Sequence, residues 1–109
     1  MNKTPPNAII ITDIVGNTVK IIVFGQDLIN KMKSLGFSCS DESMISHVNN
    51  EQKKHSIINK LVNEGALFLH GNGWYPSEAM EYYKEQKIYF GKYKIIYWTD
   101  KNTYHIEER

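Results

Sequence analysis

The sequence predicts an α+β fold in which a helical centre lies between an N-terminal β-hairpin and a C-terminal aromatic antiparallel sheet. Three observations lead to this prediction. The first quarter is rich in β-branched residues, the middle carries apolar residues at helical spacing, and ten of the 13 aromatic residues fall between Trp74 and Tyr104. At 109 residues, with 41% of them hydrophobic, the chain has room for one core, so we expect a single domain over residues 1–109.

The hairpin is expected over residues 8–24. Residues 8–14 and 18–24 are two apolar, β-branched runs, and Gly16 and Asn17 between them suit a tight turn because glycine accepts a positive φ. Gly25 then ends the second strand.

Three helices are expected in the middle of the chain. The first covers residues 26–35 and ends at Gly36, and the second is a short helix that follows Ser40 or Asp41. The third runs from about residue 51 to residue 64 and ends at Gly65. Their inward faces are formed by Leu28, Ile29, Met32 and Leu35, by Met44, Ile45 and Val48, and by Ile57, Ile58, Leu61 and Val62.

The last third of the chain is expected to form a strand, a tight turn, a helix and an aromatic sheet. Residues 66–70 form the strand, residues 71–73 turn it back to residues 74–76, and Ser77 caps a helix that ends near Lys84. The sheet strands are expected at residues 87–90, 93–98 and 103–106.

Composition argues against most chemical functions. The single cysteine, Cys39, allows no intrachain disulfide, and the four histidines have no metal-ligand spacing, so we expect no metal and no cofactor. No nucleophile motif or phosphate loop is present, which predicts a protein that is not an enzyme. The chain has no apolar run long enough to cross a membrane and no signal-peptide pattern at its start, so we expect it in the cytoplasm.

Residues 26–76 resemble the winged helix-turn-helix family. The resemblance rests on residues 45–48 before a short polar turn, on Ile58, Leu61 and Gly65 at the end of the third helix, and on the wing-like strand–turn–strand of residues 67–75. It implies a three-helix centre with a wing hairpin. The N-terminal hairpin and the aromatic C-terminal strands are additions that the family pattern lacks.

The resemblance implies a small DNA-binding regulator, as a monomer or a homodimer, whose third helix enters the major groove of double-stranded DNA. Its phosphate contacts would be Lys53, Lys54 and Lys60, its base contacts would come from the polar residues between them, and its wing would lie near the DNA backbone. However, residues 41–76 carry a net charge of −1, and the only arginine is Arg109. The residues that the resemblance assigns to nucleic-acid binding are Lys53, Lys54, His55, Ser56, Asn59 and Lys60 on the helix, with His70 and Asn72 on the wing.

The alternative is a small protein-binding inhibitor, such as a toxin-immunity protein or a phage-encoded antagonist of a host machine. Its support is the size, the net charge of +1 and the aromatic C-terminal region. Tyrosine and tryptophan are favoured at protein interfaces. The expected protein interface consists of Tyr89, Tyr93, Tyr97 and Trp98.

Overall fold

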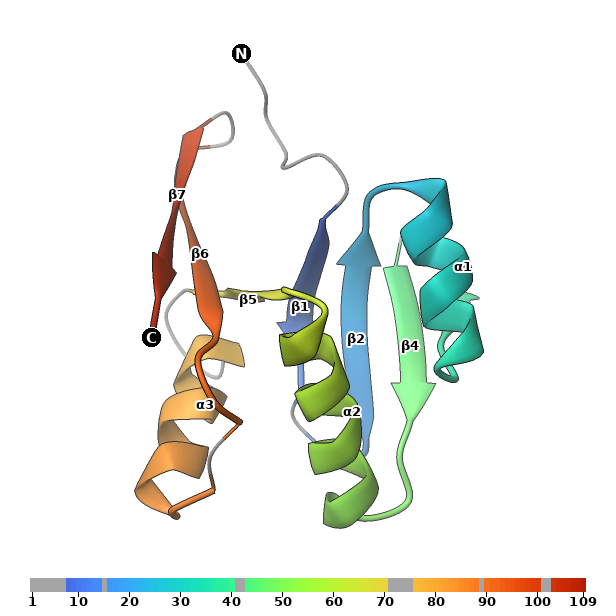
Figure 1. Cartoon of the computed structure of the whole chain (residues 1–109), viewed down its shortest axis with the longest axis horizontal. Helices are drawn as coiled ribbons and strands as arrows, with labels where there is room; N and C mark the ends of the chain where they lie inside the picture. Colours follow the sequence, from blue (N-terminus) through green and yellow to red (C-terminus); the bar gives the residue numbers. More distant parts are fainter. Residues whose placement is uncertain (1–7, 15, 41–42, 71–75, 89, 101–102) are drawn as a thin grey trace.

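One mixed sheet of seven strands organises the chain, with three helices packed on it in the part that the structure describes (Figure 1). This computed structural model describes residues 8–14, 16–40, 43–70, 76–88, 90–100 and 103–109. The elements in chain order are β1 (Ile9–Asp13), β2 (Thr18–Val23), α1 (Gln26–Ser34), β3 (Ser38–Ser40), β4 (Ser43–His47), α2 (Glu51–Asn63), β5 (Leu67–Leu69), α3 (Pro76–Glu85), β6 (Lys94–Asp100) and β7 (Thr103–Glu108).

The strand order is β3-β4-β2-β1-β5-β6-β7. β1 and β2 pair antiparallel, with Ile11 opposite Ile21, so the predicted N-terminal hairpin is confirmed. Gly16 adopts a φ of 76° in its turn, a conformation that glycine reaches without strain. β5 runs parallel to β1 on one side and to β6 on the other, while β6 and β7 form an antiparallel pair. The N-terminal hairpin and the aromatic C-terminal strands therefore belong to one continuous sheet, joined through β5.

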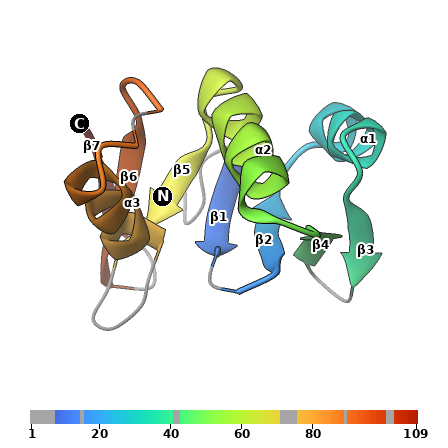
Figure 2. The same ribbon diagram turned by 90° about the horizontal axis from the view of Figure 1, so that it is seen from below.

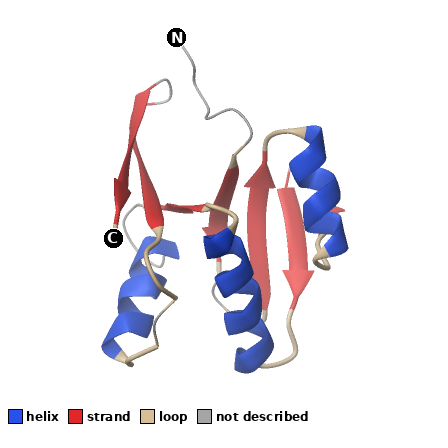
Figure 3. Cartoon of the chain, viewed as in Figure 1, coloured by secondary structure: helices blue, strands red, loops and turns tan. Residues whose placement is uncertain are grey.

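All three helices lie on one face of this sheet (Figures 2 and 3). The main core forms between them, because alternate residues of each strand point to this face and meet the apolar stripes of the helices. The buried members of this core include Ile11 of β1, Ile21 of β2, Met32 of α1, Ile58 and Leu61 of α2, Met80 of α3, Phe68 of β5 and Ile95 of β6.

The opposite face of the sheet carries a second, smaller apolar cluster. Ile10, Leu67 and Ile96 are buried there, and partly buried Trp98 and Tyr104 pack against them. None of the helices of the described residues covers this face. None of the helices that the structure describes is long and apolar enough to span a membrane.

The predicted second helix is wrong, because residues 43–47 form strand β4. Met44 and Ser46 are buried while His47 is exposed, which is the alternation of a strand. Met44, Ile45 and Val48 satisfy a helical spacing as well, but the segment is short and its backbone pairs with β2 on one side and β3 on the other. The three-helix centre of a winged helix is therefore not formed.

The predicted wing is not formed by the described residues either. β5 is paired along both edges, by β1 and by β6, which leaves no place beside it for a returning wing strand. The turn at residues 71–73 and the returning arm at residues 74–75 lie outside the described residues.

In the C-terminal third, the helix and two of the three strands are confirmed. α3 begins at Pro76, so Ser77 lies inside its first turn instead of capping it. The strand expected at residues 87–90 is wrong for the residues that the structure describes. Lys87 has a φ of 63°, and the amide of Ile88 donates to the carbonyl of Tyr83, so this segment closes the end of α3.

Candidate functional site

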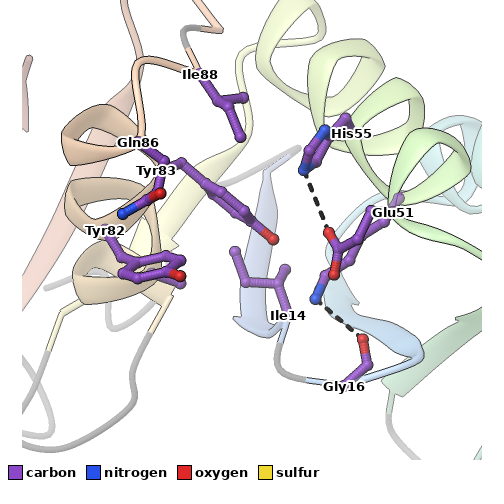
Figure 4. A pocket seen from close by; sticks show the side chains of 10 residues that line it. Ile14, Gly16, Glu51, His55, Tyr82, Tyr83, Gln86 and Ile88 are labelled. Carbon is purple, nitrogen blue, oxygen red and sulfur yellow. Dashed lines mark hydrogen bonds and ion pairs between the residues drawn. The ribbon is translucent and has the colours of Figure 1, made fainter.

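A pocket opens between the N-terminal half of α2 and α3, beyond the carboxyl end of β1 (Figure 4). Its volume is about 580 Å³, within the range of roughly 300–1,000 Å³ that is typical of small-molecule sites. The lining residues are Ile14 and Gly16 after β1, Glu51, Lys54 and His55 on α2, Ala79, Tyr82 and Tyr83 on α3, and Gln86 and Ile88 after it.

Helical spacing explains how α2 supplies its part of the pocket. The side chain of Asn50 accepts a hydrogen bond of 2.8 Å from the backbone amide of Lys53, which fixes the start of the helix at Glu51. Glu51, Lys54 and His55 are then three and four positions apart, so they share one face of the first two turns. α3 presents a matching face, with Ala79, Tyr82 and Tyr83 three and four positions apart, and Gln86 follows directly after the helix.

Lys54 is the buried charge of the pocket. Only 4% of this residue is exposed, and its Nζ donates one hydrogen bond of 3.0 Å to the carbonyl oxygen of Gly16. Within the described part of the chain, the ion pairs of the lysines involve Lys31 and Lys84 and leave Lys54 without a carboxylate. Buried ammonium groups are rare unless an anion balances them, so the pocket holds a positive charge with capacity for an anionic partner.

His55 is the second polar group whose bonding is incomplete. Its Nε2 lies 3.3 Å from Glu51 Oε2, a distance that fits an ion pair, yet the angles do not make a hydrogen bond and the buried nitrogen has no hydrogen-bond partner among the described residues. A hydrogen bond weakens steeply when it is misaligned, so this contact leaves the nitrogen able to bond another group. The ring is held edge-on to Tyr83 and Phe90, with centroids 5.1 and 5.7 Å away.

Tyr83 forms the α3 wall of the pocket and points across it towards α2 (Figure 4). Burial, with smaller contributions from the Glu51 carboxylate and from Tyr82, raises the pKa of Tyr83 to about 12. Its hydroxyl therefore stays protonated at neutral pH and remains able to donate a hydrogen bond. Tyr82 beside it is 49% exposed and lies at the edge of the pocket.

The residues that the resemblance assigned to DNA do not form one surface. Lys53, Ser56, Asn59 and Lys60 are exposed on α2, whereas Lys54 is buried and His55 lines the pocket. His70 is exposed after β5, where its Nδ1 shares a hydrogen bond of 3.0 Å with Ser77 Oγ. Asn72 lies outside the described residues.

The aromatic residues expected at a protein interface are largely occupied within the fold. Tyr93 is 4% exposed, and its hydroxyl donates to Glu81 Oε2 over 3.1 Å. Tyr97 is partly buried and stacks on His105 with centroids 4.7 Å apart, and Trp98 packs on Tyr104. Tyr93 is therefore a core residue and not part of an exposed interface. Tyr89 lies outside the described residues.

The α3 half of the pocket was missed at the level of sequence, together with the role of Glu51. The lining residues of the described chain include no serine, threonine or cysteine, and no group of three or more histidine, cysteine or acidic residues in the described ranges could hold a metal ion. What the pocket offers is hydrogen-bond donors, one buried cation, the carboxylate of Glu51 and an apolar wall of Ile14, Ala79 and Ile88.

Comparisons of the chain with protein-family models, with curated proteins and with solved structures give no match. The function must therefore be inferred from the chemistry of the pocket itself.

Proposed function

We propose that this chain is a binding protein for a small organic anion, one with a carboxylate head and an apolar body, and that the pocket between α2 and α3 is its site. The observation that carries the proposal is Lys54, an ammonium group that is 4% exposed and whose hydrogen bond among the described residues goes to the neutral carbonyl oxygen of Gly16. An anion in the pocket would supply the balancing charge that a buried cation needs.

The rest of the pocket fits the two ends of such a ligand. The head would accept hydrogen bonds from Lys54 Nζ and His55 Nε2, while the body would lie on Ile14, Ala79 and Ile88. Glu51 opposes an anion, but its side chain is 69% exposed, so water screens its charge. The N-terminal end of α2 also favours negative charge, through the helix dipole.

A binding role fits these groups better than catalysis does. Covalent catalysis of the serine, threonine or cysteine type has no residue to carry it, because the described lining residues provide no hydroxyl or thiol of these three kinds. The raised pKa of Tyr83 keeps its hydroxyl protonated at neutral pH, so it serves as a donor and not as a base.

Two features weigh against the DNA-binding regulator as the leading proposal. The helix expected to enter the major groove is packed on the sheet through Ile58 and Leu61, and it directs Lys54 and His55 into the pocket. Lys53 and Lys60 are the exposed lysines that remain on it, and two phosphate contacts would give weak binding with a shallow salt dependence.

The test is an NMR titration of the ¹⁵N-labelled chain with benzoate, with neutral benzamide as the matched probe. We expect benzoate to shift the amide signals around Glu51, His55 and Tyr83, and benzamide to shift them far less. Lys54→Met should remove the benzoate response, while Lys53→Met, one residue away and exposed, should keep it.

Two results would contradict the proposal. Equal responses to benzoate and benzamide would show that charge plays no part, and no response to benzoate at all would show that the pocket does not accept a carboxylate. A parallel titration with double-stranded DNA that shifts Lys53 and Lys60 instead would favour the regulator.

A further inference from the structure

β7 is the edge strand at one end of the sheet, and it carries an exposed apolar side chain. In the described part of the chain, β7 pairs with β6 alone. Ile106 at its centre is 45% exposed and belongs to the face of the sheet that the helices leave uncovered. An edge strand with an exposed apolar side chain is a template for pairing with another strand.

The hydrogen-bond pattern shows which backbone groups of β7 point outward. Tyr93 and Arg109 exchange both of their amide–carbonyl bonds, at 3.0 and 2.8 Å. Antiparallel pairs alternate between bonded and non-bonded positions, and the register runs without a bulge from Lys94 opposite Glu108 to Trp98 opposite Tyr104. The amides and carbonyls of Tyr104, Ile106 and Glu108 therefore point away from β6.

We propose that two copies of this chain pair antiparallel through β7, about a two-fold axis that passes between Ile106 and the partner's Ile106. In this register, Ile106 exchanges both backbone hydrogen bonds with the partner's Ile106. Tyr104 and the partner's Glu108 form the bonded pair on either side. A two-fold contact of this kind is closed, because it covers the β7 edge of each copy. It therefore forms a dimer instead of a fibre.

Charge complementarity favours this register and a second copy of this chain as the partner. His105 lies opposite the partner's Glu107, and Glu107 lies opposite the partner's His105, so the ion pair of 3.4 Å that these two side chains make within each chain is extended by complementary pairs across the axis. Among the other symmetric registers that the outward amides allow, the one with its axis at His105 places two imidazoles directly opposite each other, and the one with its axis at Glu107 places two carboxylates opposite each other. On the face of the sheet that carries no helix, the two copies of Ile106 meet next to Ile96. The apolar cluster of this face is thereby extended across the axis.

Disulfide trapping tests the register. Cys39 is exposed and must first be removed by Cys39→Ser. In that background Ile106→Cys should form a disulfide-linked dimer under mild oxidation, because the Cα atoms of a bonded antiparallel pair lie about 5.5 Å apart, inside the range of roughly 4.4–6.8 Å for disulfides. The matched control is Ile45→Cys. Ile45 is partly buried and lies on the same face of the sheet as Ile106, but on the interior strand β4, so this variant should stay monomeric.

Two outcomes of this experiment would overturn the proposal. One is that Ile106→Cys links no faster than Ile45→Cys. The other is that His105→Cys links in preference to Ile106→Cys, which would place the axis at His105.

The unmodified chain provides the second measurement. Analytical ultracentrifugation of the full chain should give the mass of a dimer, and Ile106→Lys should weaken the association at least tenfold, since two ammonium groups would meet at the axis. Ile45→Lys should leave it unchanged, with circular dichroism confirming that both variants fold. A wild-type chain that remains monomeric at the highest soluble concentration would overturn the proposal. Because β7 does not line the pocket, this result is independent of benzoate binding.

Discussion

Replacing Lys54 by methionine should raise the stability of the fold instead of lowering it. The substitution keeps most of the side-chain volume and removes a charge from a position that is 4% exposed. The lost hydrogen bond to Gly16 is worth about 1.5–3 kcal/mol, since its donor is charged. The cost of burying the ammonium is several kcal/mol, and replacing buried charges by apolar residues stabilises some proteins by about 1–4 kcal/mol.

The difference predicts that Lys54→Met raises the free energy of unfolding by about 1–2 kcal/mol. In a chain of 109 residues this corresponds to a Tm higher by about 4–8 °C. Urea unfolding and calorimetry at neutral pH measure both quantities, and Lys53→Met, at an exposed site, is expected to change neither.

Benzoate should reverse the order of the two proteins. At one hundred times its Kd, a ligand that binds only the folded state adds about 2.7 kcal/mol to the wild type. It should add nothing to Lys54→Met, so the wild type becomes the more stable protein. A Lys54→Met variant that loses 1 kcal/mol or more without ligand would refute the reasoning, because it would mean that the fold itself satisfies the ammonium group.

Two further predictions concern the walls of the pocket. Asn50→Ala removes the side-chain oxygen that caps α2, so it should cost about 1 kcal/mol in urea unfolding, whereas Asn49→Ala, at the exposed neighbouring position, should cost much less. The pKa of Tyr83 is raised from 10.0 to about 12, so the folded state favours the neutral phenol; the associated stability is complete below pH 10 and is lost as the pH rises from 10 towards 12. Tyr83→Phe should therefore make stability less dependent on pH in that window, and an unchanged dependence would show that Tyr83 ionises equally in both states. Tyr93 has a similarly raised pKa, so Tyr83→Phe with Tyr93→Phe should flatten the profile further.

The elements that the sequence predicts correctly are those that local signals determine. The first hairpin, α1, α2, α3 and the β6–β7 pair follow from turn residues, caps and apolar spacing within a few positions of each residue. Residues 43–47 were assigned wrongly because their apolar spacing suits a helix as well as a strand. The strand conformation is favoured because the backbone of these residues pairs with the edge of β2, a segment that is distant in sequence.

The pocket was hidden for a different reason. Lys54 is four positions before Ile58 and seven before Leu61, so its place on the buried stripe of α2 could be deduced from spacing. Its charge directed the interpretation towards an exposed surface instead. The facing residues on α3 could be grouped by spacing as well. Their position opposite α2, however, depends on the parallel pairing of β5 with β1, which no local sequence pattern encodes.

The position of β5 also has a consequence for how the chain folds. The two hairpins, β1–β2 and β6–β7, can form from neighbouring segments as soon as each is synthesised, but three residues of β5 must join them through parallel pairs. Those pairs close a long loop before they contribute contacts, so their formation is expected to be slow compared with the hairpins. An intermediate with both hairpins formed and β5 undocked would expose Phe68 and the inner edge of β1. We therefore expect the rate-limiting step of folding to be the insertion of this short strand.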